Sequence, residues 1–419
     1  MKILILSINY WPETTGIGDF TTYRAEYLAA AGHEVTVCTS FPYYPEWRIP
    51  EQYAGKWALD EEHNGVKIVR GYLYVPRRLS SIKRILHEAS FIVSATLRGL
   101  RQKRPDVLLV VSPPLGLAAP AMLLSRLWRV PYVFDVEDLQ PDSAADLGML
   151  PGWVVKILYR VEAAAYRHAG LVTTITQSMR KKILDKGFAE EKVTLIEPRM
   201  DGSLAGLRPG EASAFRQRYG LEEKFLVTYS GNLGVKQGLD VVIDAAALNR
   251  GDSSMLFLLV GNGADRQRIE SRARELELPN VRFLPLLDRE EFRGLMAASD
   301  LCLVTQQPAV SEIAFPSKIV TYLAAGKPII SSVNLESEVA RLTVESEAGK
   351  AVMAGDPRAL AEAVRQLRGA DLRQLGENAR QYACRRWSAE RVLGHLEKIL
   401  VATAARQPVR SVMEEGIGR

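Results

Sequence analysis

Short apolar runs alternate with amphipathic segments along the first half of this chain. The runs are rich in Val, Ile and Leu and too short for helices, which is typical of buried strands, whereas the segments between them carry apolar residues at helical spacing. We expect strands at residues 3–8, 34–39, 106–111, 132–136 and 171–175, and helices at 18–31, 113–128 and 154–169. This alternation predicts a parallel sheet with helices on both faces.

The second half of the chain repeats the same pattern. Strands are expected at residues 225–230, 255–260, 281–284, 301–304 and 329–332, and helices at 238–249, 265–276, 290–298 and around Lys318. Three further helical segments follow, at residues 357–368, 372–385 and 389–402. We therefore predict an α/β protein with two Rossmann-like, doubly wound parallel-sheet domains.

Residues 197–203 are rich in turn formers and lack apolar periodicity, which predicts a linker between the domains. We place an acceptor domain at 1–200, a donor domain at 201–385, a C-terminal helix at 386–403 that packs back on the first domain, and a tail at 404–419. In open α/β sheets, ligands bind beyond the carboxyl ends of the strands. We expect the site in a cleft between two facing domains.

The composition excludes some classes of protein and leaves others open. The chain has 419 residues, a formal net charge of +5 and a pI near 9.0, so it suits anionic small molecules or anionic lipid as well as nucleic acid. It carries no nucleic-acid-binding signature, and we expect no such partner. Its three cysteines are widely spaced, which argues against a disulfide framework or a zinc site. No run approaches the roughly 20 apolar residues that cross a bilayer, and we expect a cytoplasmic location.

Residues 315–330 predict a phosphate site. Pro316 and Ser317 are helix start signals, whereas Gly326 and Pro328 are stop signals, so Lys318 falls in the first turn of a short helix. A helix start offers unpaired N–H groups and partial positive charge, to which Lys318 adds a full charge. The alternative is an exposed lysine near a helix cap.

Residues 229–238 form a glycine-rich loop between a strand and a helix. Its three glycines allow the backbone to approach a ligand closely, and Asn232, Lys236 and Gln237 are candidates to bind diphosphate oxygens. Gly263 ends the next strand in the same way, so we expect its loop at the same rim. The alternative is a tight turn with incidental polar residues.

Residues 9–18 connect the first strand to a helix and invite comparison with a dinucleotide fingerprint. Thr21 stands where the third glycine belongs, so that pattern fails and a dehydrogenase is disfavoured. Gly16 and Gly18 remain candidates to present N–H groups to a diphosphate in the cleft. The alternative is a plain flexible loop.

Four carboxylates lie within residues 134–142, at the carboxyl end of a predicted strand. Such crowding raises at least one pKa. Asp135 and Glu137 share one face of the strand and Asp138 the other, and we favour Glu137 and Asp138 as the residues that face the cleft. The alternative is a solvated loop with helix-capping aspartates.

Residues 74–104 mix cationic and apolar side chains over a helical stretch. A basic amphipathic helix of this kind can lie on an anionic membrane surface, with Arg77, Arg78, Lys83 and Arg84 as the membrane or lipid contacts. The alternative is a buried helix with a solvated basic face.

Taken together, the motifs resemble a known family. They are found at residues 8–18, 32–35, 42–45, 230–238 and 316–318. The chain is similar, over residues 1 to 403, to retaining, nucleotide-sugar-dependent glycosyltransferases of family 4 type with the GT-B fold. Within that class it resembles the bacterial colanic acid biosynthesis branch, fucosyltransferase-like or fucosamine-transferase-like.

The resemblance implies that the second domain binds the nucleotide-sugar donor and the first domain the acceptor. It implies no metal and no cofactor, because side chains and helix ends neutralise the diphosphate; Lys318 and the 232–237 loop fit that role. Gly231, Gly263 and Ser317 would contact the donor sugar or nucleoside. Hydrogen-bond donors and positive charges that are already in place around the leaving group would contribute most to catalysis. Glu137 or Asp138, where many relatives have His before Asp, could orient the sugar or accept a proton.

The chain departs from the wider class in its donor contacts. Thr321 stands where the second Glu of a Glu-x7-Glu motif binds ribose, and Glu312 lies one residue from the first. Asn232 and Gln237 replace the Arg and Lys of the donor loop, so binding of the diphosphate would depend on Lys318, with Lys236 as a second candidate. We interpret these changes as divergence in donor recognition.

The predicted function is transfer of a sugar to a lipid-linked saccharide in exopolysaccharide or lipopolysaccharide O-antigen synthesis, by an enzyme peripheral on the inner face of the cytoplasmic membrane. Two alternatives stay open: a GT-B sugar-nucleotide epimerase and an inactive nucleotide-sugar-binding scaffold. The sequence names neither the sugar nor the acceptor, since a few contacts of unseen geometry decide both.

Overall fold

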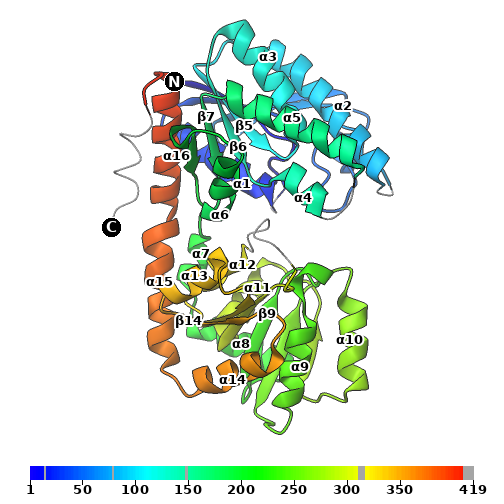
Figure 1. The fold of residues 1–419 in the computed structure, drawn as a ribbon, viewed down its shortest axis with the longest axis vertical. Helices are drawn as coiled ribbons and strands as arrows, with labels where there is room; N and C mark the ends of the chain where they lie inside the picture. The colour runs from blue at the N-terminus through cyan, green and yellow to red at the C-terminus, as the bar shows by residue number, and fades with distance from the viewer. Residues whose placement is uncertain (14–15, 78–79, 147–149, 310–316, 409–419) are drawn as a thin grey trace. The chain divides into compact units, whose positions relative to one another are not determined.

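The computed structural model describes residues 1–13, 16–77, 80–146, 150–309 and 317–408. It divides into two compact units, the first formed by Met1–Glu197 with the C-terminal segment from Glu390, and the second by Pro198–Ala389 (Figure 1). Each unit is an α/β sandwich around its own sheet. The predicted pair of doubly wound domains is confirmed.

The first unit contains an eight-stranded sheet. Its order is β3-β4-β2-β1-β5-β6-β7-β8, and every neighbouring pair is parallel except β3 with β4. The strands are β1 (Lys2–Leu6), β2 (Glu34–Ser40), β3 (Ala58–His63), β4 (Val66–Gly71), β5 (Val107–Ser112), β6 (Tyr132–Val136), β7 (Leu171–Thr174) and β8 (Val193–Leu195).

Helices cover both faces of this sheet, as buried strands with apolar residues on both sides require. One face packs on α2 (Ser81–Leu100), α3 (Ala118–Trp128), α5 (Gly152–His168) and α6 (Gln177–Asp185), and the other on α1 (Ile17–Ala30) and α16 (Ala389–Ala404). The short α4 (Gln140–Asp146) packs on α5. The last helix of the chain thus completes the core of the first unit.

The β3–β4 hairpin is a feature that the apolar pattern did not predict. Its turn is Asn64-Gly65, with φ of 48° and 77°, the positive values that a two-residue hairpin turn requires. Half of the residues of β3 are charged and it lies at the sheet edge, so it lacks the apolar run by which the predicted strands were recognised. The Asn-Gly pair was the available signal.

The second unit contains a six-stranded, all-parallel sheet of order β11-β10-β9-β12-β13-β14. The strands are β9 (Phe225–Ser230), β10 (Met255–Val260), β11 (Val281–Leu284), β12 (Leu301–Thr305), β13 (Ile329–Val333) and β14 (Gly349–Met353). The order reverses between β9 and β12, and such a switch point opens a crevice at the carboxyl ends of the strands.

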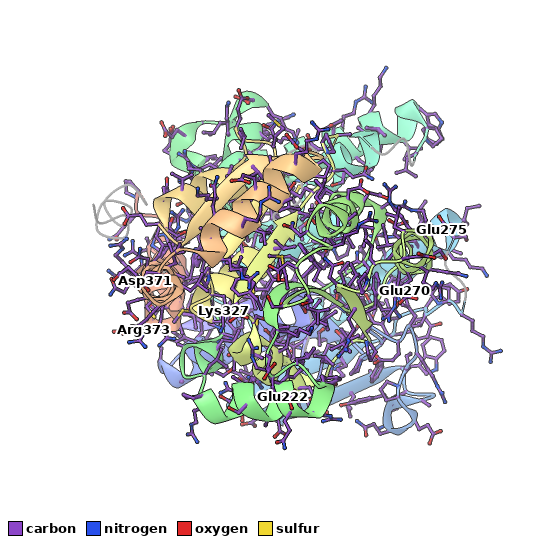
Figure 2. The ribbon with its side chains drawn as sticks, turned by 90° about the horizontal axis from the view of Figure 1, so that it is seen from below. Glu222, Glu270, Glu275, Lys327, Asp371 and Arg373 are labelled. Carbon is purple, nitrogen blue, oxygen red and sulfur yellow. The ribbon has the colours of Figure 1, made fainter. Side chains whose placement is uncertain are left out.

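Helices again cover both faces of the second sheet. One core joins α7 (Gly202–Ala205), α8 (Pro209–Tyr219), α11 (Arg289–Ala298), α12 (Lys318–Ala324), α13 (Glu338–Glu345) and α15 (Leu372–Trp387) to the sheet. The other core contains α9 (Asp240–Leu248), α10 (Arg266–Glu275) and α14 (Pro357–Arg368). Lys327, labelled in Figure 2, donates to the backbone oxygens of Ala297 and Ser299 at 2.9 Å and ties the turn after α12 to the end of α11.

The cysteines and the helices bear on two expectations from the sequence. All three cysteines are free, and two of them, Cys38 and Cys302, are buried. Burial raises the pKa of both thiols to about 12, so they pack as small apolar residues. Among the described residues, no helix combines the length and the apolar composition that crossing a bilayer requires.

Candidate active site

A cavity of about 440 Å³ lies within the second unit, at the carboxyl edge of its sheet. The loop after β9, the end of β12, the segment before α11 and the start of α12 enclose it. Its lining residues are Ser230, Gly231, Asn232, Lys236, Gln237, Val260, Leu286, Leu287, Phe292, Thr305, Gln306, Ser317, Lys318, Thr321 and Tyr322. The switch point of the sheet therefore holds a polar cavity with an apolar side.

The loops after β9 and β10 interlock at the rim of this cavity. Gly231 N donates to Val260 O at 2.9 Å, and Leu233 N donates to Asn262 O at 2.8 Å. Gly261 has a φ of 134°, and a Cβ atom there would lie 2.0 Å from Gly231 O. Glycine is required at this crossing because no side chain fits between the two backbones.

Lys318 is the first residue of α12 and reaches back over β9. Its Nζ donates to the hydroxyl of Tyr229 at 2.7 Å and lies 4.2 Å from the centroid of the Tyr229 ring. Burial lowers the pKa of Lys318 to about 8. No carboxylate of the described residues forms an ion pair with this ammonium group. Its charge is therefore held by a neutral ring and hydroxyl alone.

Two buried tyrosines fix the loop on which Lys318 rests. The hydroxyl of Tyr229 donates to Asn232 O at 2.8 Å. The hydroxyl of Tyr322 accepts from Ser230 N at 2.9 Å and donates to Ser230 O at 3.1 Å. Because Tyr322 lies on α12, it ties the helix that carries Lys318 to the end of β9.

Two polar atoms of the cavity wall have no hydrogen-bond partner among the described residues. They are the hydroxyl of Thr305, which is 2% exposed, and the Oε1 atom of Gln237. Buried polar groups normally form hydrogen bonds, so such atoms in a cavity wall are suited to contact a polar ligand. Thr305 ends β12, directly across the switch point.

The cavity brings together most of the donor-site residues predicted from sequence. They are Gly231, Asn232, Lys236, Gln237, Ser317, Lys318 and Thr321. Gly263 lies behind the rim, where an added Cβ would be 2.4 Å from Leu233 O, so its role is close packing of the two loops. Glu312 lies outside the described residues. The roles assigned to these residues stay predictions.

The carboxylates at the end of β6, in the first unit, are tied to a buried cation. Arg24 Nη1 lies 2.6 Å from Asp135 Oδ2 and 2.6 Å from Glu137 Oε1. Thr173 donates to the other oxygen of Asp135 at 2.6 Å. Glu137 Oε2 is buried without a hydrogen-bond partner among the described residues. One cation thus faces two carboxylates, and the group carries excess negative charge.

The pKa of Glu137 is raised to about 7. Burial is the main cause; Arg24 opposes it, and the nearby Asp135 adds to it. Asp138 lies next to this group, is half-buried and accepts a hydrogen bond from Ser143 at 3.1 Å. Glu137 is therefore held on the side of Asp135, while Asp138 is hydrogen-bonded to a side chain of the short α4.

The loop after β1 is organised by a buried glutamate. Glu13 accepts from Tyr43 N at 2.7 Å and Tyr44 N at 2.8 Å, and an added Cβ at Gly18 would lie 2.9 Å from Glu13 Cβ. Gly16 precedes α1 with a φ of 59°. The two glycines thus have conformational and packing reasons to be there, and their contact with a diphosphate stays a prediction.

Of the predicted membrane contacts, Lys83 and Arg84 are exposed in the first turn of α2, and Arg77 is exposed before that helix begins. Arg78 lies outside the described residues. Sequence reasoning missed Arg24, Tyr229, Tyr322 and Thr305. Arg24 had a signal, because it recurs with Thr21, Ala25 and Leu28 on one face of α1, and a cation on a buried helix face requires a carboxylate partner.

Family models match both units of the chain. Residues 15–199 match the glycosyl transferase 4-like domain, and residues 212–382 match glycosyl transferases group 1. WcaI of Escherichia coli (strain K12), a glycosyl transferase named for colanic acid biosynthesis, is 34% identical over 410 residues, covering 94% of this chain and 98% of its own. WbjE of Pseudomonas aeruginosa, also named a glycosyltransferase, is 25% identical over 300 residues, covering 68% of this chain and 72% of its own.

Solved glycosyltransferase structures share the fold. Anabaena HepE in complex with UDP superposes with a TM-score of 0.71 at 19% identity, covering 96% of this chain and 100% of HepE. WaaG, a glycosyltransferase involved in lipopolysaccharide biosynthesis, has a TM-score of 0.65 at 20% identity, covering 95% of this chain and 99% of WaaG. With two family models matched and a relative covered over almost its whole length, this chain belongs to the glycosyltransferases of family 4 type and has the GT-B fold.

Proposed function

We propose that this glycosyltransferase moves a sugar from a nucleotide-sugar donor to a saccharide acceptor in the synthesis of a cell-surface polysaccharide. The main support for a nucleotide-sugar donor is Lys318. Its ammonium group lines a polar cavity and has no carboxylate partner among the described residues. The relative named for colanic acid biosynthesis supports the polysaccharide half. Crystals of HepE with UDP and with UDP-glucose support a uridine nucleotide as the first donor to test.

The proposed chemistry centres on the leaving group. When the bond between the sugar and the diphosphate breaks, negative charge develops on the phosphate oxygens, and positive charge placed there beforehand lowers the barrier. Lys318 would supply this charge. The hydroxyl of Thr305 and the side-chain amides of Asn232 and Gln237 would supply hydrogen bonds from the same cavity. In this proposal no metal ion is required for departure of the diphosphate.

The acceptor half of the proposal rests on Glu137 and, beside it, Asp138. A carboxyl group with a pKa near 7 is suited to take a proton from a sugar hydroxyl at neutral pH. Arg24 holds one oxygen of Glu137 and leaves the other without a partner among the described residues. Glu137 would accept the proton of the attacking hydroxyl, while Asp138 orients the sugar.

We further propose that the acceptor is linked to a lipid and that the anomeric configuration of the sugar is retained. The exposed Arg77, Lys83 and Arg84 support work at the inner face of the cytoplasmic membrane, where such an acceptor would be found. Retention would be read from the proton NMR coupling of the newly formed linkage. The lipid link would be read from transfer of labelled sugar into the organic-extractable fraction.

The first experiment measures thermal stabilisation of the purified protein by UDP-, GDP-, ADP- and dTDP-sugars, on the wild type, Lys318→Ala and Lys350→Ala. Lys350 is an exposed lysine of β14 in the same unit and serves as a matched control. One nucleotide class should raise the melting temperature of the wild type and of Lys350→Ala, and fail on Lys318→Ala. Equal stabilisation of all three proteins would overturn the assignment of Lys318.

The second experiment separates transfer from its alternatives. Label should pass from the stabilising donor to extracted lipid-linked saccharides in the presence of EDTA, and Lys318→Ala should slow it by about 100-fold or more. A changed sugar nucleotide formed from the donor alone would instead indicate an epimerase. Stabilisation without any product would indicate a binding scaffold, the outcome to which Thr321 in place of the ribose-binding Glu points.

A further inference from the structure

A second cavity, of about 540 Å³, lies in the first unit at the amino edge of its sheet, where the parallel strands begin. Its wall includes Val130 and Pro131, just before β6, and Gly170, just before β7. Residues at the ends of α3, α5 and α16 complete the wall. Figure 1 shows the end of α16 at the same end of the first unit as the start of the chain, where β1 begins. A volume of this size suits a small molecule.

This cavity is separate from the carboxylates at the other end of β6. Tyr132 begins β6 and lines the cavity, whereas Glu137 directly follows the last residue of the strand. β6 has five residues, and at about 3.3 Å for each residue they place roughly 16 Å between the two ends. A small ligand in the cavity would therefore not reach Glu137.

The wall of the cavity is positively charged. Arg126, Arg129, His168 and Arg406 line it, and no Asp or Glu does among the described residues. Arg126 and Arg129 are exposed, and in the part of the chain that the structure describes neither forms an ion pair with a carboxylate. A guanidinium group binds phosphate oxygens through two parallel N–H bonds, so two unpaired arginines on one cavity favour a phosphate group as the ligand.

The helix ends at the cavity do not need these two arginines as caps. At the end of α3, Val130 N donates to Ser125 O at 3.1 Å, and the hydroxyl of Ser125 donates to Val130 O at 2.7 Å. At the end of α5, Lys192 donates to two backbone oxygens, at 2.8 and 3.2 Å. The carbonyl groups that helix ends normally leave open are thus partly satisfied by other residues. The guanidinium groups of Arg126 and Arg129 make none of these contacts.

A buried hydroxyl in the cavity wall has no hydrogen-bond partner among the described residues. Thr403, on α16, is 5% exposed, and its Oγ1 atom is the one without a partner. A threonine inside a helix can donate to the backbone oxygen four residues before it, as Thr96 and Thr343 do at 2.7 and 2.8 Å. Thr403 does not. Because buried polar groups normally form hydrogen bonds, this hydroxyl is suited to contact a polar ligand.

We propose that this cavity binds the phosphate group of a small phosphorylated molecule. Arg126 and Arg129 would contact the phosphate oxygens, and the hydroxyl of Thr403 would donate a hydrogen bond to the ligand. Met122 and Val130 supply an apolar part of the lining, against which the organic part of the ligand would pack. The inference does not rest on the proposed function, because the donor cavity lies in the second unit.

The test is calorimetric titration with inorganic phosphate, glycerol 3-phosphate and glucose 1-phosphate at constant ionic strength. Every protein carries Lys318→Ala, so that the donor cavity lacks its cation. The parent should bind at least one of the three, and R126Q/R129Q should lower that affinity by about tenfold or more for each arginine, since a hydrogen bond to a charged group contributes about 1.5–3 kcal/mol. Thr403→Val should lower it by about three- to tenfold.

The matched control is R101Q/R104Q. These two arginines are also exposed and three residues apart, and they lie at the end of α2, outside the cavity lining. The control should bind as the parent does. Because all four arginines are exposed, both double variants should melt at the temperature of the parent without ligand.

Three outcomes would overturn the proposal: no binding of any of the three compounds, binding that R126Q/R129Q leaves unchanged, or an equal loss in R101Q/R104Q. Lipid headgroups contain the same phosphate chemistry, so a further arm uses vesicles of phosphatidic acid and phosphatidylcholine. Binding to these vesicles without binding of a soluble compound would overturn the assignment to a small molecule. R126Q/R129Q in the wild-type background should keep its stabilisation by the nucleotide sugar. Failure of phosphate binding with that stabilisation intact would refute this site alone and leave the proposed function standing.

Discussion

Arg24 in the first unit and Lys318 in the second both lie near the carboxyl edge of their sheet, and their surroundings are opposite in charge. Arg24 in the first unit contacts two carboxylates at 2.6 Å. Lys318 in the second unit donates to the hydroxyl of Tyr229 and lies over its ring, and it has no carboxylate partner among the described residues. A cation matched within the protein holds its carboxylates in place, whereas an unmatched one keeps its charge for a ligand. The first edge is therefore acidic, and the unpaired charge at the second edge supports the proposal that it binds an anion.

The largest expected effect separates the two cations by stability. Arg24→Met leaves Asp135 and Glu137 buried without their cation and should lower the free energy of unfolding by about 3–5 kcal/mol. Lys318→Met removes a desolvated charge that has no ion-pair partner among the described residues, so it should leave stability unchanged or raise it. Chemical denaturation of both variants measures the difference. Equal losses of stability in the two variants would mean that the protein does not depend on Arg24 more than on Lys318 for its folding.

The next effect concerns the pH dependence of stability that arises from Glu137 in the first unit. Burial raises the pKa of Glu137 to about 7 in the folded protein, so the folded state binds an extra proton between pH 4.5 and 7. Stability from this group is therefore complete below pH 4.5 and is lost as pH rises to 7, by at most about 3–4 kcal/mol, since a pKa unit is worth about 1.4 kcal/mol. Glu137→Gln should flatten this part of the stability profile. An unchanged slope in the variant would assign the titration elsewhere.

A smaller effect concerns pH and the second unit. Burial lowers the pKa of Lys318 to about 8, so the ammonium charge that would bind a diphosphate is lost above that pH. Affinity for the donor should fall by up to about tenfold for each pH unit above 8, as measured by calorimetric titration with UDP. Lys318→Arg keeps its charge throughout this range and should bind with a flat profile. A wild-type profile that is equally flat would contradict the interpretation that Lys318 loses its charge above pH 8.

The smallest effect tests the support beneath Lys318. Tyr229→Phe keeps the ring under the ammonium group and removes the hydroxyl that joins Lys318 to Asn232 O. Because one hydrogen bond contributes about 0.5–1.5 kcal/mol net, donor affinity should fall only by about three- to tenfold. Tyr322→Phe, which changes the second tyrosine, is the matched comparison. A loss as large as that of Lys318→Ala would mean that the hydroxyl, and not the ring, holds the lysine.

Several elements of the fold could be predicted from the sequence with near-exact bounds. β9 and β10 occupy the predicted residues 225–230 and 255–260, because a strand buried on both faces shows as a continuous apolar run. The family resemblance and the enzyme class were confirmed by the family models and by WcaI. The β3–β4 hairpin was missed because an edge strand with charged residues lacks such a run.

The same holds for the candidate site: motifs within a short stretch of chain could be predicted, whereas contacts between distant residues could not. Local spacing was sufficient to place Lys318 at a helix start and Asn232 to Gln237 in a glycine loop, since both motifs lie within a few residues of chain. The roles of Gly16, Gly18, Glu137 and Asp138 stay predictions. The pairing of Arg24 with Asp135, 111 residues away, left only the weak signal of a cation on a buried helix face.

By itself, the sequence determined most of the buried strands and their following helices, the doubly wound class and the loops predicted to carry the chemistry, because periodicity and turn residues act over short stretches of chain. Only the tertiary structure decided which cation is paired with carboxylates and which has no carboxylate partner among the described residues. It also decided that the ends of three separate helices meet at one basic cavity. Both depend on contacts between distant segments, whose electrostatic and packing energies are set by distance in space and not by separation along the chain.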